Sequence, residues 1–415
     1  MQRKAGIVIG ACAAVLILAG STGVATWTFS TGTARPVGSW HEAPGPAPRP
    51  KLETRARSSP MRSESTDLAP AKGRQRVGRV QVVDQPILTT KTFHYPGATY
   101  VKVHFGRMAL GSGDYLTVAS LDGTESYRYE DTTSDKWAMS ITGDTALVSL
   151  HRVAGGAGSG VDVDQVAEGY TPAEQAASPQ STLLGPARTG REESVCGGDE
   201  SADAACYKSA DPVAFTRSRA VARLLINGTE LCTAWRVGPK DRLITNSHCF
   251  ADSVDAGNTE VWFNYQCTTC GGARNFQPTK VWGAQVLATD HVYDYTLFTV
   301  DRFRSIQKFG YLSFDPVRPA KGDELYIPQH PAGEPTKIAG ALGEKAGTCA
   351  VANPSYAGYA KNSDVAYYCD TEGGSSGSPV LSRKTDKVVA LHHFGGCPNS
   401  GVRGDLLYAR LKSLL

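Results

Sequence analysis

The segment Thr371-Glu372-Gly373-Gly374-Ser375-Ser376-Gly377-Ser378-Pro379 decides how the second half of the chain is interpreted. Gly374 and Gly377 let the backbone turn tightly around Ser376, so that the amides of Gly374 and Ser376 can converge on one point. A serine hydroxyl held in this way is a candidate nucleophile, and the two amides are a candidate oxyanion hole. The alternative is an ordinary loop, because glycine and serine are common in loops.

Two segments further upstream supply the partners that a serine nucleophile needs. Thr245-Asn246-Ser247-His248-Cys249 offers His248 as a base, and Asp294-Tyr295-Thr296-Leu297-Phe298 offers Asp294 as the acceptor that fixes the tautomer of that base. Each segment alone has a structural explanation, such as a packed histidine or an aspartate that caps a turn. Their joint occurrence with Ser376 predicts a catalytic site.

The bulk composition is that of a soluble globular protein. About 41% of the 415 residues are hydrophobic and 20% are charged, which leaves room for two or three domains. The formal net charge of +3 is too small to suggest a nucleic-acid partner. We expect no cofactor.

The cysteines gather in the second half of the chain, where nine of the ten lie. This distribution suits disulfides made in an oxidising compartment. Cys232 and Cys249 bracket His248 at a distance typical of a hairpin, and a bridge between them would tether the loop that carries the base. Cys267 and Cys270 also have the spacing of zinc ligands, but no second pair follows at zinc-finger spacing, so we expect no metal.

The first 27 residues predict export. Arg3 and Lys4 precede residues 5–26, which carry no charge, and this pattern fits a signal peptide. The run is also long enough to span a bilayer, which takes about 20 residues, so an uncleaved membrane anchor is the alternative. In either case the rest of the chain would be extracellular.

Four further regions follow from changes in composition. Residues 28–80 are rich in proline and predict an extended linker. Residues 81–153 contain short alternating strands with turn signals, which predict a small β-sandwich. Residues 154–192 are rich in Gly, Ala and Ser and predict a second linker. Strand patterns then continue through residues 193–415.

Together the three motifs resemble the trypsin/chymotrypsin superfamily, in which His, Asp and Ser follow in this order. The similarity covers about residues 193–415, and the segment around Ser376 is very close to bacterial lysyl endopeptidases. Leu391-His392-His393-Phe394-Gly395-Gly396 resembles both these enzymes and staphylococcal-type glutamyl endopeptidases. The resemblance implies an all-β, chymotrypsin-like double β-barrel that hydrolyses peptide bonds with His248, Asp294 and Ser376 as a catalytic triad. The sandwich has a looser similarity to N-terminal prodomain regions of related bacterial proteases.

The resemblance favours cleavage after Lys or Arg. Asp370 lies six residues before Ser376, the spacing at which trypsin-like enzymes carry the acidic residue of their specificity pocket. Asp405 resembles the specificity aspartate that lysyl endopeptidases carry at a similar offset.

Cleavage after Glu is the alternative. Thr371 and His393 match positions that glutamyl endopeptidases use to hold a carboxylate, although lysyl enzymes also have Thr and His nearby. Neighbouring residues on a strand point to opposite faces, so His392 and His393 cannot both line the pocket. We expect His393 on the substrate side, with a packed histidine as the other explanation.

The resemblance also implies a set of disulfides. Cys232–Cys249 matches the histidine-loop disulfide of the superfamily, and Cys349–Cys369 could clamp the loop that leads to the nucleophile. Lysyl endopeptidases suggest Cys196–Cys397 and a bridge from Cys206 to the region of Cys267 and Cys270. One of those two cysteines would stay unpaired, unless they pair with each other and leave Cys206 free.

One departure from the superfamily concerns activation. Animal enzymes carry Asp immediately before the nucleophile to receive a new N-terminus, whereas this chain has Ser375. We therefore expect the N-terminal domain to inhibit the catalytic domain in cis until cleavage within residues 154–195. Arg188 and Arg191 are candidate self-processing sites.

A function of another class is a surface-anchored binding module, in which the sandwich grips a ligand and the catalytic domain is inactive. The intact residues His248, Asp294 and Ser376 argue against it.

Overall fold

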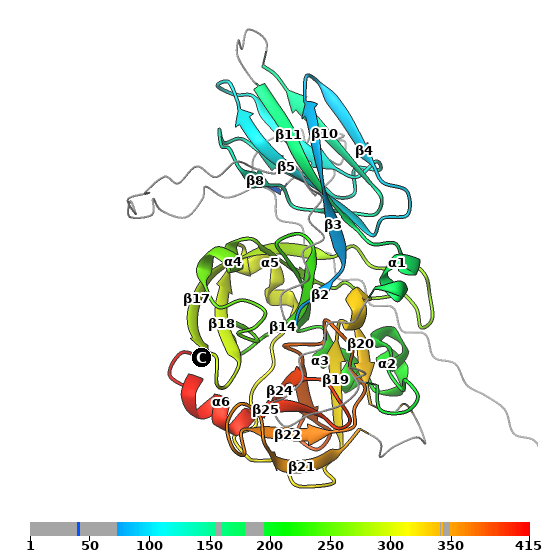
Figure 1. Ribbon diagram of the computed structural model, residues 1–415, viewed down its shortest axis with the longest axis vertical. Coiled ribbons are helices and arrows are strands. Elements are labelled where there is room, and N and C mark those ends of the chain that lie inside the picture. Colours follow the sequence, from blue (N-terminus) through cyan, green and yellow to red (C-terminus); the bar gives the residue numbers. More distant parts are fainter. Residues whose placement is uncertain (1–39, 42–72, 154–159, 179–194, 341, 343–348) are drawn as a thin grey trace, which may run out of the picture. The chain divides into compact units, whose positions relative to one another are not determined.

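The computed structural model describes residues 40–41, 73–153, 160–178, 195–340, 342 and 349–415 (Figure 1). The expected signal segment or anchor, residues 1–27, lies outside the described residues, as do Arg188 and Arg191. No helix in the described ranges is both long enough and apolar enough to cross a membrane. Residues Gly38–Leu415 belong to one compact unit.

Two sheets packed face to face form the first folded region. Strand β10 shows why, because Ala146, Val148 and Leu150 alternate along it and are all buried. One sheet has the order β1-β7-β6-β10-β4, and the other has the order β3-β11-β5-β8, with β9 also paired to β5. The strands are β1 (Trp40–His41), β3 (Gly78–Pro86), β4 (Thr90–His94), β5 (Tyr100–Ala109), β6 (Tyr115–Ala119), β7 (Ser126–Tyr129), β8 (Lys136–Trp137), β9 (Ile141–Thr142), β10 (Thr145–His151) and β11 (Gly160–Gly169).

Strand β11 lies within residues 154–192, where we expected a linker. Val161 and Val163 alternate with aspartates and are buried, and β11 pairs with both β3 and β5. The sandwich therefore needs this strand and extends beyond the expected boundary at residue 153. The many Gly, Ala and Ser residues around the strand make its alternating valines and aspartates hard to recognise as a strand in the sequence.

A closed six-stranded barrel follows the sandwich. Its order is β13-β16-β17-β18-β15-β14, and pairing of β13 with β14 closes it. Asn227 and Gly228 join these two strands with φ angles of 50° and 78°, as a tight hairpin turn requires. The strands are β13 (Val221–Ile226), β14 (Glu230–Arg236), β15 (Leu243–Thr245), β16 (Thr259–Phe263), β17 (Thr279–Asp290) and β18 (Tyr295–Val300), and the short β2 (Gln75–Arg76) adds to β14.

The second barrel is built from the C-terminal strands in the order β12-β20-β19-β23-β24-β25-β22-β21. A bridge between Glu324 and Ala350 brings the beginning of β21 back beside β19. The strands are β12 (Ala202–Asp203), β19 (Leu325–Gln329), β20 (Lys337–Ala339), β21 (Val351–Tyr356), β22 (Asp364–Tyr367), β23 (Pro379–Ser382), β24 (Val388–Phe394) and β25 (Asn399–Arg403).

Helices are short in every described region. The last one, α6, packs Leu407 and Leu411 against Val388 and Leu391 of β24 (Figure 1). The helices are α1 (Pro172–Ala177), α2 (Ala204–Ala210), α3 (Pro212–Ser218), α4 (Ser253–Gly257), α5 (Phe303–Ile306) and α6 (Gly404–Leu411), with 3-10 turns η1 (Gln307–Phe309) and η2 (Pro331–Gly333).

The expected all-β double barrel is confirmed, with 45% strand and 14% helix. A shared apolar core joins the two barrels, and it contains Trp235 and Leu297 from the first and Leu381 and Leu391 from the second. Residues at the ends of strands from both barrels can therefore meet at one site.

A buried charge cluster joins the sandwich to the first barrel. Lys102 of β5 and Glu125 come from the sandwich, and Glu260 of β16 and Lys280 of β17 come from the barrel. Lys102 Nζ lies 2.6 Å from Glu260 Oε1, and Lys280 Nζ lies 2.7 Å from Glu125 Oε1. The four side chains are between 0 and 4% exposed. Each part thus contributes one cation and one anion, so that neither leaves an unpaired charge in the interface.

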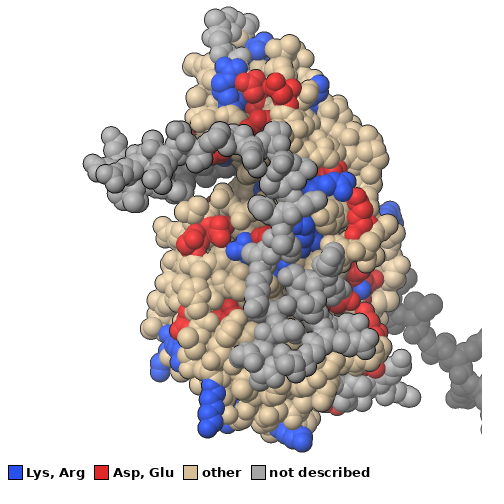
Figure 2. Space-filling model, in the orientation of Figure 1, with Lys and Arg blue, Asp and Glu red and all other residues tan. Residues whose placement is uncertain are grey.

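The exposed charges are mixed. Figure 2 shows acidic and basic side chains interspersed over the described part of one face. Such a mixture is ordinary for the surface of a soluble protein.

Candidate active site

His248 and Asp294 meet at the edge of the first barrel. The Nδ1 atom of His248 lies 2.8 Å from Oδ2 of Asp294, and the amide of His248 donates to Oδ1 at 3.1 Å. The Ser247 hydroxyl donates to the same Oδ1 at 2.8 Å, and the Asn246 side chain donates to the Asp294 carbonyl. These bonds orient the imidazole, and within the described residues its Nε2 atom has no hydrogen-bond partner.

The charge state of Asp294 follows from its surroundings. Burial alone would raise the pKa of this carboxyl, but the imidazoles of His248 and His393 lower its pKa well below the usual value. Asp294 is therefore a carboxylate. It favours the tautomer of His248 in which Nδ1 donates and Nε2 is left to accept a proton.

Ser376 lies in a loop whose backbone conformation requires glycine at positions 374 and 377. Gly374 and Gly377 have φ angles of 98° and 89°. A Cβ atom on Gly374 would lie 2.3 Å from Leu231, and one on Gly377 would lie 2.1 Å from the Thr233 carbonyl. The Thr233 amide donates to the Ser376 carbonyl at 2.8 Å. The loop is thus held against β14, one residue from the disulfide-bonded Cys232.

Residues 73–77 (segment 73–77) lie over Ser376 and His248. The Ser376 hydroxyl donates to the Gly73 carbonyl at 3.4 Å. A Cβ atom on Gly73 would lie 2.6 Å from Cδ2 and 2.9 Å from Nε2 of His248. These residues fall within the predicted linker 28–80, because nothing in their composition indicates a contact with a distant site.

Comparison with known proteins identifies the family. Residues 232–391 match the family described as trypsin-like peptidase domain. A protein of Plasmopara viticola, described as secreted RxLR effector protein 73, is 34% identical over 329 residues, which are 76% of this chain and 79% of the relative. The chain therefore contains a trypsin-like peptidase domain. The neighbourhood of Ser376, His248 and Asp294 is therefore part of a serine peptidase domain.

Two solved structures are similar to this peptidase. A glutamyl endopeptidase is 19% identical with a TM-score of 0.38, and the match covers 53% of this chain and 98% of that one. A Mycobacterium tuberculosis protease in its active form is 14% identical with a TM-score of 0.37, and the match covers 55% of this chain and 93% of that one.

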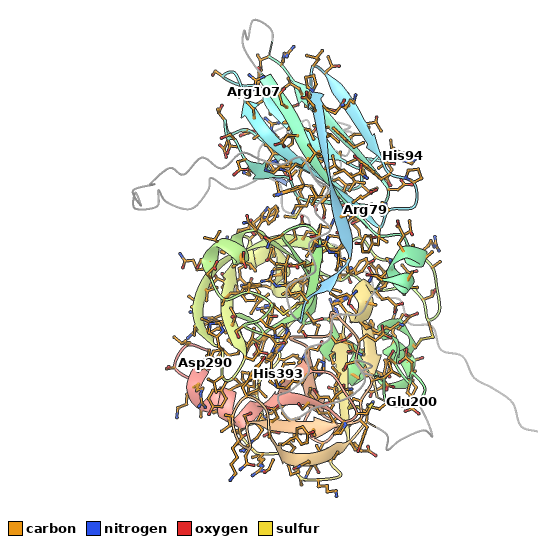
Figure 3. The ribbon with its side chains drawn as sticks, viewed as in Figure 1. Arg79, His94, Arg107, Glu200, Asp290 and His393 are labelled. Atoms are coloured by element: carbon orange, nitrogen blue, oxygen red, sulfur yellow. A yellow bond between two sulfur atoms is a disulfide. The ribbon has the colours of Figure 1, made fainter. Side chains whose placement is uncertain are left out.

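His393 lies in the interior of the peptidase domain (Figure 3). Its Nδ1 atom is 3.1 Å from Oδ2 of Asp294, and its Nε2 atom is 2.8 Å from Oδ2 of Asp364. Burial alone would lower the pKa of His393, but the two carboxylates raise it to about 9. Both ring nitrogens are thus engaged by the protein, which differs from the expectation that His393 faces the substrate. Its neighbour His392 hydrogen-bonds Tyr367 instead, at 2.7 Å.

Asp370 and Thr371 lie on the loop that leads to Ser376. The Asp370 carboxylate accepts hydrogen bonds from the amides of Cys196 and Glu200, at 3.1 and 2.8 Å. Burial raises its pKa. The Thr371 hydroxyl is buried and has no hydrogen-bond partner among the described residues.

Asp405 lies apart from these residues. It lies in the first turn of α6 and forms a two-point ion pair with Arg403. No interaction in the described part of the chain joins its carboxylate to Ser376.

Four disulfides support the peptidase domain, and they agree with the pairs that the resemblance implied. They are Cys196–Cys397, Cys206–Cys270, Cys232–Cys249 and Cys349–Cys369. Cys267 is buried and is the free cysteine of the described residues. The sulfur atoms of Cys232 and Cys249 lie within 4.8 Å of His248, but as a disulfide they offer no thiolate to a metal.

Proposed function

We propose that the chain is a secreted serine endopeptidase with Ser376 as nucleophile, His248 as general base and Asp294 as the group that orients the base. His248 Nε2 would take the Ser376 proton as the hydroxyl oxygen attacks a peptide carbonyl, and would then give it to the leaving amine. The amides of Gly374 and Ser376 would stabilise the oxyanion. Water would hydrolyse the resulting acyl-enzyme by the same route. The observation that carries this proposal is the 2.8 Å contact between His248 and Asp294, which leaves Nε2 without a hydrogen-bond partner among the described residues, beside the same Gly73 whose carbonyl accepts from Ser376.

We also propose that the N-terminal region inhibits the enzyme in cis, and that segment 73–77 is the inhibiting element. The 3.4 Å hydrogen bond between Ser376 and Gly73 supports this, as does the position of Gly73 against the ring of His248. A substrate and this segment could not occupy the same space. Activation would then require the segment to leave, whether or not a bond within residues 154–195 is cut.

Cleavage after Lys or Arg remains the first candidate for specificity. It is supported by Asp370 on the loop before Ser376 and by His393, whose two nitrogens already bind carboxylates and so cannot hold a substrate glutamate. The buried Thr371 hydroxyl without a partner favours cleavage after Glu as the second candidate, because it could donate to a substrate carboxylate.

Export is supported by the four disulfides, by the uncharged run of residues 5–26 and by a relative that is itself described as secreted. Attachment to the outer face of the membrane through residues 5–26 is the alternative to release.

A cleavage-site profile tests the function. A denatured protein mixture is incubated with the full chain carrying Gly73→Ala, which should loosen segment 73–77, and new termini are read by mass spectrometry. We expect cuts after Lys or Arg that fall by about 1,000-fold or more with Ser376→Ala or His248→Ala. The control Ser378→Ala changes a neighbouring serine whose hydroxyl has no bond among the described residues, and it should keep activity.

The outcomes separate the proposals. Cuts after Glu would overturn basic specificity and keep the endopeptidase. The absence of any Ser376-dependent cut would overturn the endopeptidase and favour the binding module.

A further inference from the structure

Segment 73–77 pairs with β14 as an extended peptide would. It runs antiparallel to β14, with Gln75 opposite Leu231 and Arg76 opposite Glu230. The Val77 amide donates to the Thr229 carbonyl at 2.8 Å. Main-chain pairing of this kind is how a groove beside a sheet edge holds an extended chain without regard to its sequence.

Arg74 holds a defined position in this peptide. The carbonyl that faces Ser376 Oγ belongs to Gly73. Arg74 is therefore the residue that follows the carbonyl nearest the proposed nucleophile. In a substrate lying the same way, this residue would be the first on the leaving-group side of the cleaved bond.

The guanidinium of Arg74 is bound by three acceptors from three different parts of the peptidase domain. Its Nη1 atom lies 2.7 Å from Glu230 Oε2 on β14, and its Nη2 atom lies 3.4 Å from Asp255 Oδ2 on α4. Its Nε atom donates to the His248 carbonyl at 3.2 Å. The side chains of Arg74 and Glu230 are each only 12% exposed. The planar fork of arginine matches this set, whereas a lysine could engage fewer of the acceptors at once.

The acceptors belong to the enzyme and not to the sandwich. Glu230 and Asp255 are two acids that bind the same guanidinium, so this cation lowers their mutual repulsion. The third acceptor is the backbone of His248 itself. When segment 73–77 leaves, the carboxylates of Glu230 and Asp255 stay next to the catalytic base. A cationic side chain of a substrate can then take the place of Arg74.

We propose that Glu230, Asp255 and the His248 carbonyl form a subsite for a cationic side chain, best filled by arginine, on the residue immediately after the cleaved bond. Arg74 is its occupant within the chain. This inference rests on the proposed function, and it concerns the side of the bond opposite to Asp370.

The first test measures how fast a small aryl phosphonate labels Ser376 in the full chain. Arg74→Ala removes the occupant of the subsite and should raise the labelling rate about tenfold, because charge-assisted bonds to two carboxylates are lost. Arg79→Ala is the matched control, since Arg79 also pairs with two carboxylates, Glu168 and Glu174, but within the sandwich and near α1 (Figure 3). Equal rates for wild type and Arg74→Ala would overturn the role of Arg74 as occupant.

The second test uses the Arg74→Ala chain and peptides that differ only after the cleaved bond, where they carry Arg, Lys, Gln or Glu. We expect kcat/KM for Arg to exceed that for Gln by about tenfold, with Lys between them and Glu lowest. Glu230→Gln or Asp255→Asn should bring the ratio of kcat/KM for the Arg peptide to kcat/KM for the Gln peptide (the Arg-to-Gln ratio) close to one. Glu324→Gln, which removes an exposed acid of the second barrel, should leave the ratio unchanged.

Failure of the subsite and failure of the enzyme give different results. An Arg-to-Gln ratio near one in the Arg74→Ala chain, or a ratio that Glu230→Gln and Asp255→Asn do not change, would overturn the subsite while peptide hydrolysis still stands. If no variant is labelled at Ser376 and no peptide is hydrolysed, the proposed function is wrong and the subsite falls with it.

Discussion

The N-terminal part of the chain touches the peptidase domain in two regions that are built in opposite ways. In the buried charge cluster, four ionised side chains are closed off from water and joined reciprocally. Segment 73–77 instead pairs its main chain with β14, binds through the guanidinium of Arg74 and packs Val77 in an apolar cluster with Leu231 and Trp262. The contrast suggests that the sandwich is attached permanently, whereas the segment is a ligand that substrate can replace.

The reason for this difference lies in the cost of separation. Burial alone would raise the pKa of Glu260, but Lys102 and Lys280 lower it. Glu260 also accepts hydrogen bonds from Ser140 and Trp262. Removing one member of such a cluster leaves buried charge without compensation, which is strongly destabilising. The acceptors of Arg74, by contrast, all belong to the enzyme, so a cationic side chain of a substrate can replace its guanidinium without leaving them uncompensated.

The largest expected effect is in the charge cluster. Glu260→Gln would leave Lys102 and Lys280 with too little negative charge and should lower the free energy of unfolding by roughly 3–5 kcal/mol. Denaturation with guanidinium chloride, followed by tryptophan fluorescence, measures the change.

An exposed ion pair of the sandwich provides the control. Asp162→Asn removes the partner of Arg107, which is 62% exposed, and should leave the free energy of unfolding nearly unchanged (Figure 3). If Glu260→Gln were no more destabilising than Asp162→Asn, the sandwich would not be held as we describe.

The second prediction concerns buried charge inside the site. Because its neighbours raise the pKa of His393 to about 9, the imidazolium stabilises the fold fully below its ordinary pKa of about 6.5, and this stabilisation is lost as the pH rises through about 9. We expect the free energy of unfolding to fall by about 1–3 kcal/mol between pH 6.5 and pH 9.5. His393→Gln should flatten this dependence. An identical slope in both proteins would show that His393 is not the titrating group.

Much of the fold and part of the site could be predicted from the sequence. Short motifs predicted His248 and Asp294 as site residues, because their segments occur together with that of Ser376, although each segment alone has a structural explanation. Strand β11 could have been found from its alternating valines. Segment 73–77 could not, since its place depends on pairing with β14, more than 150 residues away, and not on its own composition. The face on which His393 lies depends on the register of β24, which the sequence leaves undetermined.

The smallest effect on stability is expected in segment 73–77. Gly73→Ala adds a Cβ atom where His248 already lies and at a φ of 87°, so the segment should move away from the site. Because the rest of the chain is unaffected, the free energy of unfolding should change by less than about 1 kcal/mol, while the phosphonate labelling rate should rise about tenfold. A large loss of stability without faster labelling would mean that the segment is part of the permanent structure.

The most direct measurement is the position of the covalent phosphonate label in the Gly73→Ala chain, mapped by mass spectrometry after digestion. The account predicts one labelled residue, Ser376, and loss of the label when His248 is also changed to alanine. A label on another serine, or one on Ser376 that forms equally fast without His248, would contradict it.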